Sequence, residues 1–159
     1  MSVPREQFES VQPQIKESAN KDPFFGRFDI TLDDLKNIVW KLSEIKIGYG
    51  SILLDRALMA KNQMGDFFTL QFVDEGINGK ALPNRYFAPY LLVDDNDITI
   101  RPIAGTLIAS LVDVGVLHEQ RYFTLLQGMT RWDYKSGNLR IYTSGERENN
   151  EIILIFKPQ

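Results

Sequence analysis

Glu119 is the ionisable residue whose position in the sequence most favours chemistry. On a helix, with about 100° between successive residues, it shares one side with apolar and aromatic neighbours. These neighbours are Val116, Tyr122, Phe123 and Leu126. A desolvated carboxylate could serve a hydrolase as general acid or base if a second charged group faced it. The candidates for that group are Asp113, Arg85, Arg101 and Arg121, and spacing alone does not place them.

The alternative role for Glu119 is structural. Its oxygens would accept hydrogen bonds from backbone amides or from Asn84, and would thereby fix a helix to a sheet. Because buried polar groups in native proteins are nearly always paired, we favour this role. We therefore predict no catalytic residue and expect the chain not to be an enzyme.

Each remaining pattern lacks something that metal or cofactor chemistry requires. His118 is the only histidine, which excludes a site with several histidines, and the chain has no cysteine. The acidic run at 94–97 could attract calcium, but it lacks the long ligand loop with a closing glutamate and is typical of a hairpin turn. The glycines at 48 and 50 are not followed by a phosphate-binding lysine. We predict no metal site, no cofactor site and no cofactor.

Composition indicates one soluble globular unit. The chain has 159 residues, of which 43% are apolar and 25% charged. Its net charge of -3 disfavours a nucleic acid partner. No apolar run is long enough to be a transmembrane segment, no export signal is visible, and we expect a monomer.

The pattern of apolar residues predicts mainly antiparallel strands. β-rich or alternating runs occur at 37–47, 68–72, 98–101, 139–143 and 152–156. Turn residues at 94–97 and 136–138 predict hairpins between neighbouring runs. Thr31, followed by Asp33 and Asp34, could cap a single helical turn.

The only convincing long helix is predicted over about 114–127, ended by Gly128. One helix among several strands, without strand–helix–strand alternation, indicates an α+β fold with a strongly curved antiparallel sheet. Residues 30–159 would form this domain. Residues 1–29 read as an N-terminal arm, either a tether or an ordered lid, whose Phe24 and Phe25 would dock its end onto the domain.

Three short motifs follow one another in the second half of the chain. The first is Gly79-x-Ala81-x-Pro83-Asn84-x-Tyr86-x-Ala88-x-Tyr90, the second contains Thr106, Ala109 and Ser110, and the third is Glu119-x-x-Tyr122-x-x-x-Leu126. In order and spacing the sequence resembles the META domain family, typified by heat-shock-induced bacterial envelope lipoproteins. The motif residues with expected structural roles are Gly79, Ala81, Asn84, Tyr86, Tyr90, Thr106, Ser110, Glu119, Tyr122 and Leu126.

The resemblance implies a sheet that curls towards a barrel and packs against one helix. It also implies that Pro83 and Ser110, which stand where the family has two cysteines, lie side by side. Packing of Leu82, Tyr86 and Leu107 would then replace a disulfide.

The same resemblance implies a non-enzymatic, envelope-associated protein of unassigned biochemical role, linked to stress response. A lipid or a partner segment would bind in an apolar groove. The alternatives are a pilotin-like assembly module that recruits a protein through an exposed sheet edge or the arm, and a hydrolase using Glu119. The expected location is the cell envelope, periplasmic or lipid-anchored, with the cytoplasm as the alternative.

Overall fold

A long antiparallel sheet forms most of the molecule. The computed structural model describes residues 22–27, 29–106, 115–144 and 151–159. Eight strands follow one another in the order β6-β5-β4-β3-β1-β10-β9-β8, and β2 and β7 add to β1 and β5. Their bounds are β1 Trp40–Ile47, β2 Gly50–Leu53, β3 Thr69–Phe72, β4 Gly76–Lys80, β5 Arg85–Leu92, β6 Ile98–Ile100, β7 Ala104–Gly105, β8 Met129–Lys135, β9 Asn138–Thr143 and β10 Ile152–Pro158.

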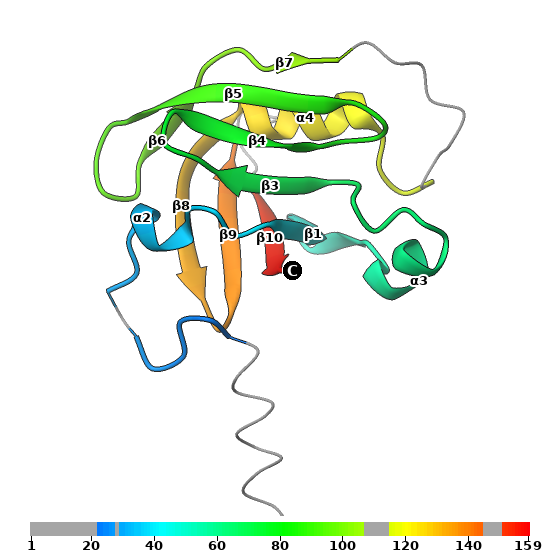
Figure 1. Cartoon of the computed structure of the whole chain (residues 1–159), viewed down its shortest axis with the longest axis horizontal. Coiled ribbons are helices and arrows are strands. Elements are labelled where there is room, and N and C mark those ends of the chain that lie inside the picture. The colour runs from blue at the N-terminus through cyan, green and yellow to red at the C-terminus, as the bar shows by residue number, and fades with distance from the viewer. Residues whose placement is uncertain (1–21, 28, 107–114, 145–150) are drawn as a thin grey trace, which may run out of the picture.

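The sheet curls into a nearly closed barrel (Figure 1). Its two end strands meet where the β5–β6 hairpin approaches β8, with an isolated bridge between Asp97 and Arg131. Asn96 strengthens this contact, because its Nδ2 donates to the Trp132 carbonyl at 3.0 Å and its own carbonyl accepts from Trp132 N–H at 3.0 Å. The α+β, barrel-like prediction is confirmed.

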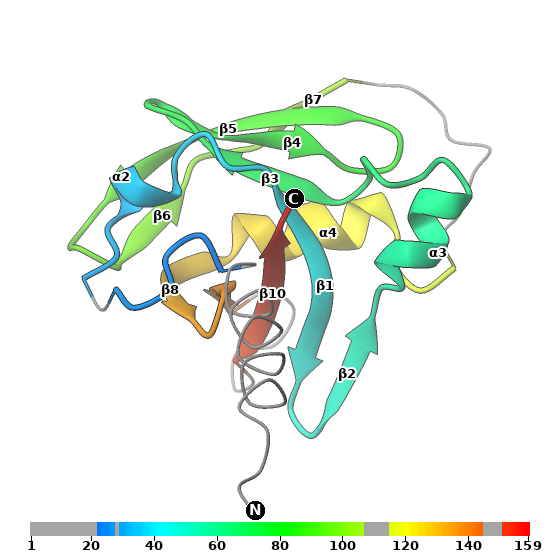
Figure 2. The ribbon, with the colours of Figure 1, turned by 60° about the horizontal axis from the view of Figure 1, so that its bottom comes forward.

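Strand β1 changes its neighbour half-way along. Trp40 and Lys41 pair with β3, whereas residues from Glu44 onwards pair with β2. A bulge against β10 falls between Leu42 and Glu44, where the Ser43 hydroxyl donates to the Ile155 carbonyl at 3.1 Å. Beyond this bulge β1 stays paired with β10 as far as Ile47, while β2 becomes its other neighbour, and the tip of the β1–β2 hairpin projects from the molecule (Figure 2).

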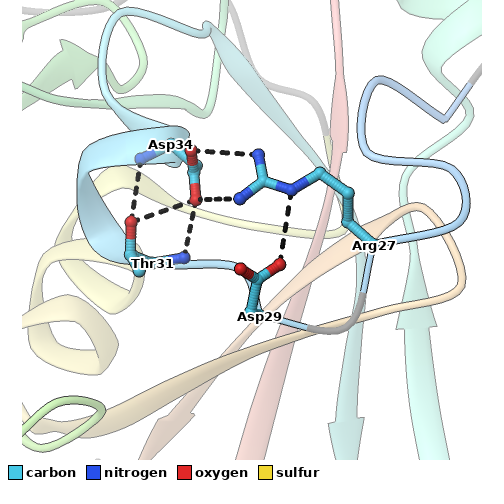
Figure 3. Close-up of polar contacts among 4 residues, drawn as sticks. All are labelled: Arg27, Asp29, Thr31 and Asp34. Atoms are coloured by element: carbon cyan, nitrogen blue, oxygen red, sulfur yellow. Dashed lines mark hydrogen bonds and ion pairs between the residues drawn. The ribbon is translucent and has the colours of Figure 1, made fainter.

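The described residues contain three helices. These are α2 Leu32–Leu35, α3 Arg56–Lys61 and α4 Glu119–Gln127. Thr31 caps α2 as predicted, in a reciprocal capping box with Asp34. Both oxygens of Asp34 also accept from the Arg27 guanidinium at 3.1 Å (Figure 3). None of the helices in the described ranges has the length and apolar character needed to cross a bilayer.

Helix α4 is shorter than the sequence predicted. Gly128 is its C-cap, as expected, but the helix begins at Glu119 with His118 as N-cap. Val116 therefore precedes the helix and is exposed, so the prediction that it shares an apolar helix side with Glu119 was wrong. The helix joins both halves of the barrel, because Tyr122 Oη donates to the Thr69 carbonyl of β3 and Thr143 Oγ1 of β9 donates to the Leu125 carbonyl.

Aromatic side chains fill the interior of the barrel. Six aromatic residues of the described ranges are less than 2% exposed: Trp40, Phe68, Phe72, Tyr122, Trp132 and Phe156. The end of the predicted arm contacts this body through Phe24, whose ring meets that of Tyr134 edge to face at 5.2 Å, and through a hydrogen bond from Tyr134 Oη to Asp22. Phe25 is 68% exposed and does not share the role. Residues 1–21 of the arm lie outside the described residues.

Candidate functional site

The Glu119 carboxylate holds the turn between β4 and β5. Its Oε1 accepts from the backbone N–H groups of Leu82 and Asn84 at 3.1 and 2.9 Å, and its Oε2 accepts from Asn84 Nδ2 at 2.7 Å. Both kinds of donor named by the sequence analysis are therefore present. We call Leu82, Asn84, Thr106 and Glu119 the Glu119 cluster.

Asn84 extends the cluster to the segment after β7. The residue is 5% exposed, and its Oδ1 accepts from the Thr106 hydroxyl at 2.7 Å. The same hydroxyl accepts from the backbone N–H of Arg85 at 3.1 Å. Helix start, hairpin turn and β7 strand end are thus tied by one chain of hydrogen bonds.

A pair of buried tyrosines lies on the inner side of this cluster. The hydroxyls of Tyr86 and Tyr122 lie 3.0 Å apart, and both donate to the Thr69 carbonyl, at 2.6 and 3.0 Å. Burial raises the pKa of Tyr86 well above its ordinary value, and burial likewise raises the pKa of Tyr122. Both phenols therefore stay protonated at neutral pH and serve as hydrogen-bond donors.

Gly79 allows these groups to come together. A Cβ at this position would lie 2.1 Å from the Thr69 carbonyl oxygen and 2.7 Å from Tyr86 Oη. No side chain fits there, which gives the glycine of the first motif a packing role.

The cluster has the geometry of a structural clamp. All three bonds to Glu119 come from neutral amide donors, and no ion pair joins it to an arginine among the described residues. The described residues also contain no group of three or more histidine, aspartate or glutamate side chains arranged to hold a metal ion. Nothing in this arrangement points to catalysis.

The fold and the motif residues match a known family. The family model of the META domain matches residues 33–155. The chain belongs to the META domain family. Among curated proteins, none matches it. A structure determined by NMR, that of a protein from Burkholderia xenovorans, is similar with a TM-score of 0.55 and 19% identity, covering 79% of this chain and 83% of that chain. At this identity the likeness shows the fold alone.

The other motif residues of this META domain have separate places. Tyr90 is half-buried on β5, where its Oη donates to the Val73 carbonyl at 3.1 Å. Ala81 and Leu126 are buried in the core. Pro83 lies in the turn between β4 and β5. Ser110 lies outside the described residues, and with it the expected contact with Pro83 and the packing of Leu107.

Strand β2 presents a free edge that the sequence analysis did not single out. Leu54 N–H donates to the Ser43 carbonyl at 2.9 Å, so these two residues form a hydrogen-bonded pair between β1 and the end of β2. In an antiparallel ladder, hydrogen-bonded pairs alternate with pairs that share no backbone hydrogen bond. Ser51 and Leu53 therefore turn their N–H and C=O groups away from β1. No described residue bonds these groups. The sequence of β2 is a short run after a glycine turn, and nothing in such a run indicates that one edge of the strand lacks a neighbouring strand.

Exposed apolar side chains gather beside this edge. Tyr49, Leu53 and Leu58 are 112, 66 and 53% exposed. A hollow of about 770 Å³ adjoins Leu53, with Leu54 and Ile155 also among its apolar lining residues. Its charged residues are Glu44, Lys46, Asp55, Arg56 and Lys157. We call this region the β2 surface.

Proposed function

We propose that this META domain is a non-catalytic binding module that takes up an extended segment of a partner protein along the free edge of β2. The observation that carries the proposal is the unpaired backbone of Ser51 and Leu53 beside exposed Tyr49 and Leu53. An exposed edge of this kind accepts a further strand through main-chain hydrogen bonds, while neighbouring pockets select its side chains.

The β2 surface fits a segment of alternating character. In an added strand, every second side chain would lie on the same face of the sheet as exposed Leu53, which lines the hollow. Both charge signs surround the hollow, so polar residues of the same segment would find partners there. These features favour a peptide that is apolar on one face.

The filled interior favours the outside of the sheet over an internal lipid groove. Trp40, Phe68 and Phe72 are 0% exposed and occupy the space that a bound acyl chain would need. We therefore place the proposed partner contact on the β2 surface.

The test is a peptide-display selection against the immobilised chain, followed by anisotropy measurements on the selected peptides. Ser51→Pro removes a backbone donor that no described residue uses, and proline is tolerated at such an edge position. Leu53→Lys removes the apolar contact. We expect each substitution to weaken binding by about tenfold or more.

Leu91→Lys is the matched control, since Leu91 is 50% exposed on β5. It should leave the affinity unchanged. Selected peptides that bind both β2 variants as tightly as the original chain would show that the β2 edge is not the binding surface.

We also propose that the protein acts in the bacterial cell envelope. The support is its membership of a family typified by envelope lipoproteins. Expression of the complete open reading frame in its own host, followed by cell fractionation, tests this. Recovery of the protein in the cytosol would contradict it.

A further inference from the structure

A second hollow is lined by residues of strands β1, β3, β4 and β5. Its volume is about 480 Å³, and its lining includes the hydroxyl- and amide-bearing residues Thr69, Gln71 and Asn78. The lining also includes three cationic residues: Lys41 of β1, Lys80 of β4 and Arg85 of β5. We call it the Lys80 hollow.

Two of these cations oppose each other directly. Lys80 and Arg85 are cross-strand partners in the β4–β5 ladder, so their side chains leave the sheet on the same face. Like charges at such positions repel and destabilise the pair. The arrangement therefore has a cost in the unliganded protein.

Within the part of the chain that the structure describes, no ion pair compensates for this repulsion. Lys41, Lys80 and Arg85 pair with no carboxylate within the described residues. Lys80 Nζ instead lies 4.9 Å from the centre of the Phe67 ring. Among the residues that line the hollow, Asp66 is the acidic one. Three cations against this acid leave a positive site on a chain whose net charge is -3.

We propose that the Lys80 hollow binds the phosphate group of a phosphate monoester. Arginine can hold two phosphate oxygens in a bidentate contact, and lysine adds a compact charge. A phosphate monoester carries a charge of about -1.5 to -2 at neutral pH, so it neutralises more of the excess positive charge than a single carboxylate does. The Thr69 hydroxyl and the amides of Gln71 and Asn78 supply further donors.

The hollow is large enough for more than the phosphate itself. Small-molecule sites typically measure about 300–1,000 Å³, and the Lys80 hollow lies within that range. The monoester can be a soluble metabolite or the headgroup of a lipid such as phosphatidic acid. This inference does not depend on the β2 proposal, because Ser51 and Leu53 take no part in it.

Amide NMR shifts test the site with glycerol 3-phosphate as the soluble probe, at constant ionic strength. Addition should shift the amides of Asn78, Gly79 and Lys80. Arg85→Gln and Lys80→Gln should each weaken binding by about threefold to tenfold. Lys61→Gln is the control, since Lys61 is an exposed cation on α3. The proposal would be overturned if chloride alone caused the same amide shifts. It would also be overturned if Lys61→Gln weakened probe binding as much as Arg85→Gln and Lys80→Gln.

A charge reversal supplies a second readout. Arg85→Glu places a carboxylate opposite Lys80, so it should raise the thermal midpoint of the free protein while abolishing probe binding. A folded Arg85→Glu variant that binds the probe as tightly as the original chain would also overturn the proposal.

Vesicle flotation distinguishes the two sources. Retention on phosphatidylcholine vesicles only when they contain phosphatidic acid would assign the site to a lipid headgroup. Binding of glycerol 3-phosphate without vesicle retention would assign it to a soluble ligand. Binding to neither would refute the site.

Discussion

Glu119 shows how one carboxylate can organise several segments. It accepts three hydrogen bonds from residues 82 and 84, which lie 37 and 35 positions away in the chain. Hydrogen bonds to a charged acceptor are stronger than those between neutral groups, so this contact stabilises the packing of α4 against the β4–β5 hairpin.

Glu119→Gln is expected to destabilise the protein. The substitution removes the charge and replaces one acceptor with a donor that faces other donors, at a cost of about 2–3 kcal/mol in the free energy of unfolding. Urea denaturation measures the loss. Gln120→Ala, at the exposed neighbouring position, should change the midpoint little. An unchanged midpoint for Glu119→Gln would mean that the clamp does not contribute.

Asp34 should make stability depend on pH in the acidic range. The backbone N–H of Thr31, followed by the Arg27 guanidinium, lowers the pKa of Asp34 from 3.8 to about 2 (Figure 3). A lowered folded-state pKa means that the stabilisation is complete above pH 3.8 and is lost as the pH falls towards 2. The stability difference between the original chain and Asp34→Asn should therefore shrink across that window.

The measurement is urea denaturation at several acidic pH values. Asp95→Asn, in the exposed β5–β6 turn, is the control and should follow the original chain. A difference for Asp34→Asn that stays constant down to pH 2 would contradict the assigned cause.

Hydrogen bonding by Glu119 could be predicted from the sequence because a carboxylate near apolar helix residues needs partners. Its setting was predicted less well. Helical periodicity placed Val116 beside Glu119, but helix α4 begins only at Glu119, so Val116 lies in the segment that precedes the helix. The contact between Tyr86 and Tyr122 also had no local signal, since it joins residues 36 positions apart.

At the level of the elements, helix ends were predicted correctly where a capping residue in the sequence marks them. Gly128 marked the end of α4, and Thr31 the start of α2. The start of α4 has no such signal, because the His118 side chain makes no capping hydrogen bond. Helix α3 does have a capping aspartate, Asp55, which accepts from Leu58 N–H at 3.0 Å, and the sequence analysis overlooked it.

Gly79→Ala is expected to disrupt the packing of β3 against β4. A methyl group would lie 2.1 Å from the Thr69 carbonyl oxygen, which belongs to the backbone and cannot turn away. We expect a loss of about 3 kcal/mol in the free energy of unfolding. Gly65→Ala is the control, because a Cβ at Gly65 would come no closer than an ordinary 3.5 Å to the Ala60 Cα atom. Equal thermal midpoints for the two variants would contradict the predicted clash.

For the whole molecule, periodicity predicted the class of fold but not how the barrel closes. Alternating runs indicated strands, and the turns at 94–97 and 136–138 indicated their antiparallel order. Closure depends on Asn96 meeting Trp132, a contact across 36 positions. The change of β1 from β3 to β2 likewise depends on a bulge, which apolar spacing does not reveal.

Asn96→Ala tests the closure. Its side chain provides one of the hydrogen bonds between the β5–β6 hairpin and β8, so its loss should cost about 1 kcal/mol. Hydrogen exchange should become faster at the Trp132 amide, which donates to the Asn96 carbonyl. Asp95→Ala, one residue earlier, should leave that amide protected. Unchanged exchange in Asn96→Ala would show that the backbone contact closes the barrel without the side chain.

The bulge at Ser43 has a practical consequence for engineering. Because β1 exchanges β3 for β2 at this point and its pairing with β10 ends at Ile47, the Gly48–Tyr49 tip lies beyond every strand pair that encloses the aromatic core. An epitope or fluorophore inserted at the tip should leave the melting behaviour of the body intact. The tip of the β1–β2 hairpin is thus a suitable site for attaching the domain to a surface or labelling it.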